Sequence, residues 1–271
     1  MVNRGTIDLE KKVNDYVNLN SRIRYPIIED LLTHTSGYHA FIPLFSSIWV
    51  LISKGFNKKN IYQNLNEDWL YQSLKKIRPL RKRKYRYSDY NYAVLALIIQ
   101  TIEQRPYKQV IIDYIQSEIG MTNTFYGSEA QTKNHKYSWL WEDNNPFLAS
   151  GGLFSTIEDM LLFLNFQLQN QERLNISHAK YHRTNINRDV YTGFSWNSFY
   201  KGKFYWHIGG QGYYRSYVLF DLKKEISIVI LSTVDVDIQH VSRLGSSLYR
   251  NAKRNPASLQ NFFEIYKGLT T

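Results

Sequence analysis

The stretch Tyr87-Ser88-Asp89-Tyr90-Asn91-Tyr92, followed at once by Ala93-Val94-Leu95-Ala96-Leu97-Ile98-Ile99, decides how the rest of this chain is organised. Seven successive apolar side chains leave no polar face, so the element that carries them is predicted to be buried on every side. Alanine and leucine, with no glycine or proline through Gln104, favour a core helix. Periodicity alone does not separate such a helix from a buried strand.

The polar residues ahead of the apolar run lie at the N-terminal end of the predicted helix. There the first backbone N–H groups lack partners within the helix. In one interpretation, Ser88 or Asp89 is an N-cap that accepts a hydrogen bond from the first turn and does nothing more. In the other, the same hydroxyls, carboxylate and amide belong to an active site. These residues alone favour the N-cap, because caps are far commoner than active sites.

Length and composition describe a folded chain. A protein of 271 residues can bury a substantial core, as one large domain or two interleaved ones. Its 43% hydrophobic and 15% aromatic content exclude a disordered chain. No apolar run reaches the ~18 residues of a membrane span, and the opening Met1-Val2-Asn3-Arg4-Gly5-Thr6 has no apolar h-region of a signal peptide. With no cysteine and no metal-ligand spacing among seven histidines, neither a metal nor another cofactor is indicated.

The net charge of +11 is concentrated directly before Tyr87, in the run Lys75, Lys76, Arg78, Arg81, Lys82, Arg83, Lys84 and Arg86. Most runs of this kind are solvated loops. The alternative is a positive rim that attracts an anionic polymer through Arg81, Lys82, Arg83 and Lys84. The interleaved tyrosines could stack on nucleic-acid bases. No nucleic-acid-binding signature accompanies them, so we do not expect nucleic acid to be the partner.

Other patterns predict helices first and strands later. Short helices are predicted at 27–32, ending in Thr33-His34-Thr35-Ser36-Gly37, and at 111–119. Thr156 is predicted to cap a longer helix in a capping box with Asp159. Strands are predicted at 204–208, 216–221 and 226–231, with a flexible break at 209–212. An amphipathic helix at 238–252 is expected to cover one face of the sheet.

Four segments in this order resemble the serine beta-lactamase and penicillin-binding-protein superfamily, and within it the class C beta-lactamase-related branch of esterases and D-amino-acid peptidases. They are Leu31-Leu32-Thr33-His34-Thr35-Ser36-Gly37, Tyr87-Ser88-Asp89, Gly151-Gly152-Leu153-Phe154-Ser155-Thr156 and His207-Ile208-Gly209-Gly210. The resemblance runs from about Val2 to about Arg254. It implies an α+β fold of the beta-lactamase/transpeptidase type, an antiparallel sheet flanked by helices with a large, mostly helical insertion. It places residues 1–19 and 150–255 in the sheet region, 20–149 in the helical region and 256–271 in a C-terminal tail.

The resemblance also implies acyl-transfer chemistry. The superfamily uses a Ser-x-x-Lys nucleophile, because a serine hydroxyl attacks well only when a basic neighbour accepts its proton. It adds a Tyr-x-Asn motif and a Lys-Thr-Gly or His-x-Gly strand. Carried over, Tyr87 is the general acid/base, Asp89 stands at the Asn position and His207 stands at the cationic position of the strand. Ser88, Gly209 and Gly210 are implied to bind substrate, with the Gly210 N–H as a candidate oxyanion donor. The alternative for His207 is a strand-end histidine satisfied by a neighbour.

The sequence departs from the family pattern in three places. Asp89 replaces the usual Asn, and an ionised Asp accepts hydrogen bonds without donating any. Arg81-Lys82-Arg83-Lys84 replaces a Pro-Gly turn. The Ser-x-x-Lys segment and the first strands of the sheet would lie ahead of Met1. The two internal Ser-x-x-Lys spacings, Ser73 to Lys76 and Ser177 to Lys180, do not precede the first matching segment, and we discount both.

Three functional hypotheses follow. The first is an N-terminally truncated serine hydrolase, inactive as given, whose complete form acts on D-Ala peptides, beta-lactams or esters. Its relatives are typically exported or displayed at the cell surface. The second is a pseudoenzyme that binds a cell-wall peptide or an anionic wall polymer without chemistry. The third, and least favoured, is a basic nucleic-acid-binding module. Loss of the first strands also predicts an uncovered sheet edge and poor solubility.

Overall fold

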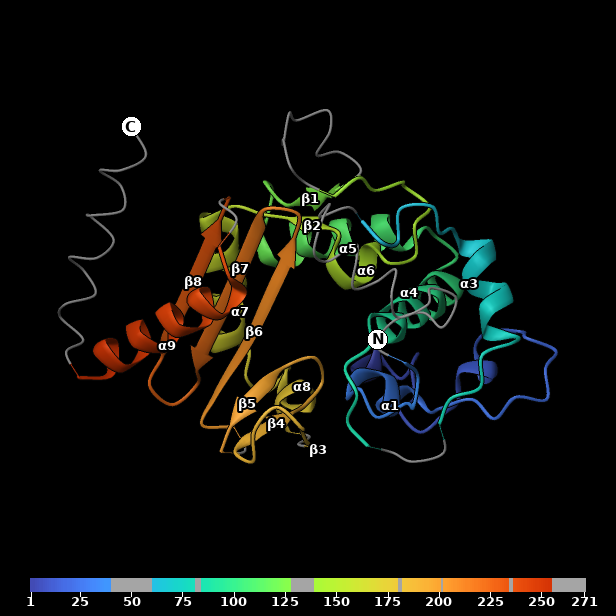
Figure 1. Cartoon of the computed structure of the whole chain (residues 1–271), viewed down its shortest axis with the longest axis horizontal. Helices are drawn as coiled ribbons and strands as arrows, with labels where there is room; N and C mark the ends of the chain where they lie inside the picture. Colours follow the sequence, from blue (N-terminus) through green and yellow to red (C-terminus); the bar gives the residue numbers. More distant parts are fainter. Residues whose placement is uncertain are drawn as a thin grey trace.

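The computed structural model describes residues 1–39, 60–80, 84–127, 139–179, 182–200, 202–233 and 236–254. Its main feature is a six-stranded antiparallel sheet in the order β3-β4-β5-β6-β7-β8 (Figure 1). The strands are β3 (His182–Arg183), β4 (Val190–Thr192), β5 (Asn197–Phe199), β6 (Phe204–Gln211), β7 (Tyr214–Asp221) and β8 (Ile226–Ser232). The predicted α+β architecture with an antiparallel sheet is confirmed.

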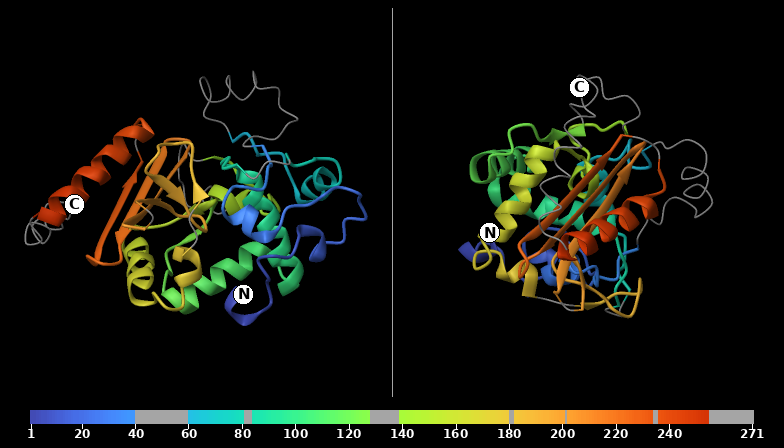
Figure 2. Two further views of the ribbon diagram at one scale, coloured as in Figure 1. Left: turned by 90° about the horizontal axis from the view of Figure 1, so that it is seen from below. Right: turned by 90° about the vertical axis from the view of Figure 1, so that its left-hand side faces the viewer.

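Helices cover both faces of this sheet. The alternation of side chains along β6 sends Phe204, Trp206 and Ile208 into an apolar cluster with α9 (Ile238–Arg254). Tyr205 points the other way and packs in a second cluster with α7 (Ile157–Gln169). His207 therefore lies on the same face as Tyr205. Seen from below, α9, the sheet and the helical region follow one another from left to right (Figure 2).

The helical region is built around α4 (Asp89–Glu103). Ala93, Val94 and Ile98 are fully buried, and Leu97 and Ile99 are packed against the same core. The predicted buried helix is thus confirmed. The other elements beside it are η1 (Val2–Arg4), η2 (Val13–Asp15), α1 (Ile28–Leu32), α3 (Glu67–Leu74), α5 (Tyr107–Tyr114), η3 (Ile115–Ile119) and α6 (Leu148–Gly151). The two-stranded sheet of β1 (Phe125–Tyr126) and β2 (Leu153–Phe154) and the short helix α8 (Asn175–Ala179) complete the described fold.

The predicted flexible break at 209–212 is wrong. β6 continues to Gln211 and pairs with β7 from Tyr205↔Phe220 to Gln211↔Tyr214. A Cβ on Gly209 would lie 2.6 Å from the Ser216 Oγ on the opposing strand, so this glycine serves a close approach between strands. The chain turns only at Gly212 and Tyr213, where Gly212 has a φ of 53°.

At the start of α7, one of the two hydrogen bonds of the predicted capping box is present. The Thr156 Oγ1 accepts from the Asp159 N–H at 3.2 Å, as expected. The Asp159 carboxylate does not return to the cap. It accepts instead from the Asn123 N–H at 2.8 Å and the Thr124 hydroxyl at 2.7 Å. Asp159 therefore ties α7 to the segment ahead of β1. In the part of the chain that the structure describes, no helix has the length and apolar character that crossing a membrane requires.

Gly37 allows a close approach that no other residue would permit. Its φ is 83°, and a Cβ there would collide with the Leu80 carbonyl oxygen. We expect Gly37→Ala to lower the free energy of unfolding by about 2–4 kcal/mol, because backbone strain adds to a steric clash. Gly5→Ala is the matched control, since Gly5 has a φ of 73° with nothing within 4 Å and carries the strain alone. Urea denaturation of both variants measures the difference, and equal losses would contradict the clash.

The outer edge of β8 carries no strand among the described residues. Its sequence, Ile226–Ser232, is uncharged and rich in β-branched residues, which is the pattern of an aggregation-prone edge. We expect the isolated chain to self-associate at micromolar concentration and Ser227→Lys to reduce this association. Thr101→Lys, at an exposed position on α4 in the helical region, should leave it unchanged. Light scattering against concentration measures both, and a monomeric, cooperatively melting wild-type chain would contradict the expectation.

Candidate active site

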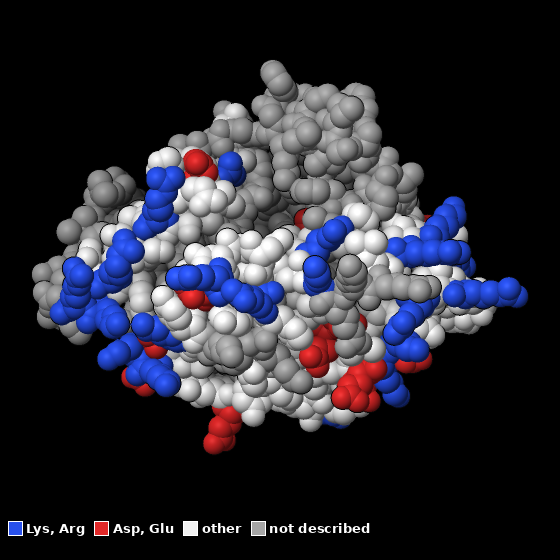
Figure 3. Space-filling model, turned by 60° about the horizontal axis from the view of Figure 1, so that its bottom comes forward, with Lys and Arg blue, Asp and Glu red and all other residues white. Residues whose placement is uncertain are grey.

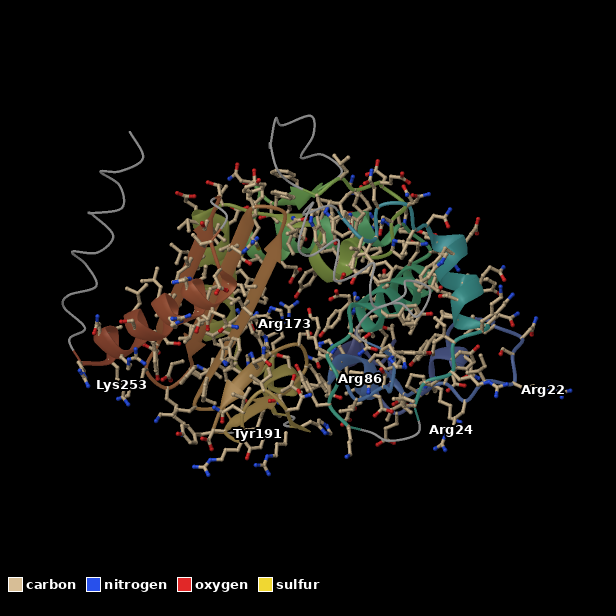
Figure 4. All side chains as sticks on the ribbon, in the orientation of Figure 1. Arg22, Arg24, Arg86, Arg173, Tyr191 and Lys253 are labelled. Carbon is tan, nitrogen blue, oxygen red and sulfur yellow. The ribbon has the colours of Figure 1, made fainter. Side chains whose placement is uncertain are left out.

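A candidate site forms where the turn after α1, the segment that leads into α4 and strand β6 come together. The first two segments are joined by a backbone hydrogen bond, from the Arg86 N–H to the His34 carbonyl at 2.8 Å. Arg86 belongs to the side of the helical region that faces the sheet (Figure 4). β6 approaches from the sheet side, where β5 pairs only with its first three residues, 204–206.

His34 is the residue that ties these segments together. Only 3% of its surface is exposed, and its φ of 55° is uncommon for a residue other than glycine. Its Nδ1 accepts from the Ser88 N–H at 3.1 Å and faces the Asn91 Nδ2 at 3.3 Å. The Asn91 Oδ1 accepts from the Ser36 hydroxyl at 2.7 Å. The polar start of α4 is therefore satisfied by the turn after α1.

Tyr87 lies against His34, with ring centroids 4.5 Å apart and planes tilted by 32°. The phenol hydrogen bonds to the Asp89 carboxylate, which also accepts from the Tyr62 hydroxyl at 2.7 Å. Although 41% of Tyr87 is exposed, desolvation by the surrounding protein and the neighbouring carboxylate raise its pKa well above the ordinary value. At neutral pH the phenol is protonated and donates its one hydrogen to Asp89.

His207 belongs to strand β6, on the sheet side of the site. Burial lowers its pKa, and burial followed by the charge of His207 lowers the pKa of His34 to about 3. The two imidazoles are thus close enough to interact, and both are neutral at pH 7. His34 contacts the Tyr87 ring and interacts electrostatically with His207, so both predicted residues act on the same imidazole. The predicted cationic position is occupied by an uncharged ring.

Gly209 and Gly210 lie in β6 beside a tight hairpin. The two-residue turn makes Gln211↔Tyr214 the closing, hydrogen-bonded pair. In an antiparallel ladder such pairs alternate with pairs whose backbone groups point outward. The Gly210 N–H is therefore directed to the β5 side of β6, away from β7. This direction agrees with a donor that faces the cleft.

Ser88 occupies a different environment from the one the sequence implies. It is fully buried, and its hydroxyl donates to the His39 carbonyl at 2.7 Å, so it does not present that group to a ligand. It stands at the N-cap of α4 without a side-chain capping bond, because its hydroxyl is committed elsewhere. The other serines of interest are also engaged. Ser73 bonds to the Tyr90 hydroxyl at 2.7 Å, and Ser177 donates to the Leu174 carbonyl at 2.8 Å.

Three residues that contribute to the site were not identified from the sequence. His34 lies in a quoted motif but received no role, and only its neighbours in space reveal one. Tyr62 is 27 positions from Asp89 and carries no local signal. Ser195, with a φ of 70°, accepts from the Tyr92 hydroxyl at 2.5 Å and donates its N–H to the Leu32 carbonyl at 3.2 Å. Ser195 thereby links the β4–β5 turn to both α1 and α4.

Charge is spread widely over the molecule. Lysine and arginine gather at both ends of the face in Figure 3. On α9 the exposed basic residues are Arg243, Arg250, Lys253 and Arg254. Lys84 and Arg86 are exposed, whereas Arg81, Lys82 and Arg83 lie outside the described residues. Among the residues described, no group of three or more His, Asp or Glu side chains could hold a metal ion.

A model of the Beta-lactamase family matches residues 1–244. A search of curated proteins found no significant match. Among solved structures, the octameric penicillin-binding protein homologue from Pyrococcus abyssi has a TM-score of 0.71 at 18% identity, with 92% of this chain and 62% of that chain covered. The beta-lactamase/D-alanine carboxypeptidase from Yersinia pestis, complexed with citrate, has a TM-score of 0.70 at 19% identity, with 86% and 72% covered.

A D-stereospecific amidohydrolase from Streptomyces sp. has a TM-score of 0.66 at 17% identity, with 90% of this chain and 80% of that chain covered. At these identities the likeness concerns the fold, and it confirms the predicted beta-lactamase/transpeptidase-like architecture. The chain spans less than two thirds of the Pyrococcus abyssi protein.

The carboxylate of Asp89 should control the ionisation of Tyr87. We expect Asp89→Asn to lower the pKa of the Tyr87 phenol, because a neutral amide no longer opposes the phenolate. NMR titration of protein labelled with ¹³C at tyrosine Cζ measures this pKa, with Tyr87→Phe identifying the signal. Asp113→Asn, at an exposed carboxylate on α5, is the control and should leave the titration unchanged. An unchanged or higher pKa in Asp89→Asn would show that the carboxylate does not act on this phenol.

Proposed function

We propose, from the premise that this chain belongs to the Beta-lactamase family, that its cleft binds an acyl substrate such as a beta-lactam, a D-Ala peptide or an ester. One observation carries the proposal. Tyr87 from the start of α4 and His207 from β6 both border His34, in a fold whose relatives include beta-lactamases and D-alanine carboxypeptidases.

Each of the groups at this site can make a contact that acyl-group recognition requires. The Gly210 N–H, directed to the β5 side of β6, can donate to the carbonyl oxygen of the acyl group. The Tyr87 phenol gives its one hydrogen to Asp89, so its oxygen can accept an N–H or O–H of the ligand. Asp89 accepts from that phenol and keeps the proton on it. The neutral His207 can hydrogen bond to the substrate without adding charge.

The attacking nucleophile is the part that these residues do not supply. The serines of both internal Ser-x-x-Lys spacings are engaged away from the cleft, Ser73 with Tyr90 and Ser177 with Leu174. We therefore infer that the 271-residue chain binds acyl compounds without forming an acyl-enzyme. In one version, a longer protein contributes a Ser-x-x-Lys segment ahead of Met1 and is an acyl hydrolase. In the other, the chain is a binding protein of cell-wall peptides.

Binding and acylation can be measured separately on the same protein. We expect the chain to bind benzylpenicillin reversibly, with Tyr87→Phe and His207→Gln each weakening binding about three- to tenfold, as the loss of one hydrogen bond predicts. Isothermal titration calorimetry measures the affinity, and intact mass spectrometry should detect no acyl adduct. An adduct on Ser73 or Ser177 would contradict the assignment of the cleft.

The two versions differ in the DNA upstream of Met1. An in-frame Ser-x-x-Lys a short distance ahead favours the hydrolase, and the extended protein should then hydrolyse a chromogenic cephalosporin or a nitrophenyl ester. Mutating that serine to alanine should abolish the turnover and leave reversible binding in place. Absence of the motif together with retained binding favours the binding protein.

A further inference from the structure

The two ring nitrogens of His34 have different environments. The Ser88 backbone N–H can only donate, so the Nδ1 that it contacts at 3.1 Å must offer a lone pair. The Asn91 amide agrees, since its oxygen is used by Ser36 and its Nδ2 is turned to the same Nδ1. The hydrogen of the neutral ring is therefore on Nε2, and protonation of Nδ1 would break the contact with Ser88.

The Nε2–H is the second polar group of the His34 ring. It has no hydrogen-bond partner among the described residues. A buried donor without a partner is costly, and such donors are rare. Yet Nε2 is not one of the fully enclosed unpartnered atoms, which include the His178 Nδ1 and the Trp206 Nε1. Only 3% of the His34 surface is exposed, and we place this N–H in the exposed part.

The surroundings of the ring define what the N–H can meet. Tyr87, Tyr92 and Tyr85 lie with ring centroids 4.5, 5.3 and 6.0 Å from it, and His207 approaches from β6. All four groups are uncharged at neutral pH. An imidazole in one tautomer among neutral neighbours is a preorganised donor that loses little entropy when it binds. Its complement is an acceptor oxygen.

We propose that His34 is a substrate-binding residue, whose Nε2–H donates a hydrogen bond to a carbonyl or carboxylate oxygen of the ligand held between Tyr87 and His207. This assignment rests on the proposed function, because it names a further contact for the same acyl ligand. It gives the turn after α1 a direct part in recognition.

Two substitutions of His34 test the roles of its two ring nitrogens separately. In His34→Asn the Oδ1 takes the place of Nδ1, accepts from Ser88, and tolerates the left-handed φ, but the outer N–H is lost. In His34→Gln the Nε2 takes the place of the ring Nε2–H, and the inner acceptor is lost. We expect His34→Asn to keep the wild-type melting temperature and to bind benzylpenicillin about three- to tenfold more weakly. We expect His34→Gln to melt lower and to keep most of the affinity.

Two further measurements complete the test. Benzylpenicillin methyl ester lacks the carboxylate, so the affinity difference between wild type and His34→Asn persists with the ester if a carbonyl is the acceptor and vanishes if the carboxylate is. In the free protein, ¹⁵N NMR should show His34 with an Nε2–H that exchanges with water and a bare Nδ1. On ligand binding this proton should move downfield. His240→Asn on α9 is the control and should change neither readout.

The outcomes distinguish this inference from the proposed function. If His34→Asn binds like wild type while Tyr87→Phe and His207→Gln are weakened, the cleft is real and the role of His34 is wrong. If benzylpenicillin does not bind the wild-type chain, the proposed function fails. The free-protein spectrum then decides for His34 alone, and a proton on Nδ1 or an Nε2–H shielded from water overturns the inference.

Discussion

The burial of α4 is the constraint on which the rest of the structure depends. A helix that carries Ala93–Ile99 without a polar face must be enclosed by other segments, and enclosure removes water from its N-terminal turn. The polar groups there need protein partners instead. The turn after α1 supplies them through His34 and Ser36. A requirement of the core thus places two sequence-distant segments at one edge of a cleft.

The sheet supplies the other edge by a different principle. β6 is longer than β5, which pairs only with 204–206, so the rest of its β5-side edge is left to face the helical region. The hairpin with β7 keeps this part of β6 extended through Gly209 and Gly210. A Cβ on Gly209 would crowd the Ser216 hydroxyl, which would have to move. The candidate site is therefore the junction of an enclosed helix and a strand edge that pairs with no further strand among the described residues.

Electrostatic interactions at this junction determine which side chains carry a proton. One carboxylate accepts from two phenols, and burial together with the charge of His207 lowers the pKa of His34, while burial lowers the pKa of His207. Tyr87 consequently keeps its proton and donates it in a hydrogen bond to Asp89, so the phenol oxygen is left to accept a hydrogen bond. The Asp at a position where relatives usually have Asn is consistent with this: it holds the phenol and does not donate to the substrate.

The sequence by itself determined the buried helix, the capped helix α7, the strands at 204–208, 216–221 and 226–231 and the family, because hydrophobic period, caps and ordered motifs are local signals. It also named Tyr87, Asp89 and His207. It misjudged Gly209–Gly212, where local glycine content suggested a break and cross-strand packing made a strand. The environments of Ser88, Tyr62 and His34 were decided only by the tertiary structure. A hydroxyl, a phenol and an imidazole each acquire a role from partners distant in sequence, and spacing along the chain carries no record of those contacts.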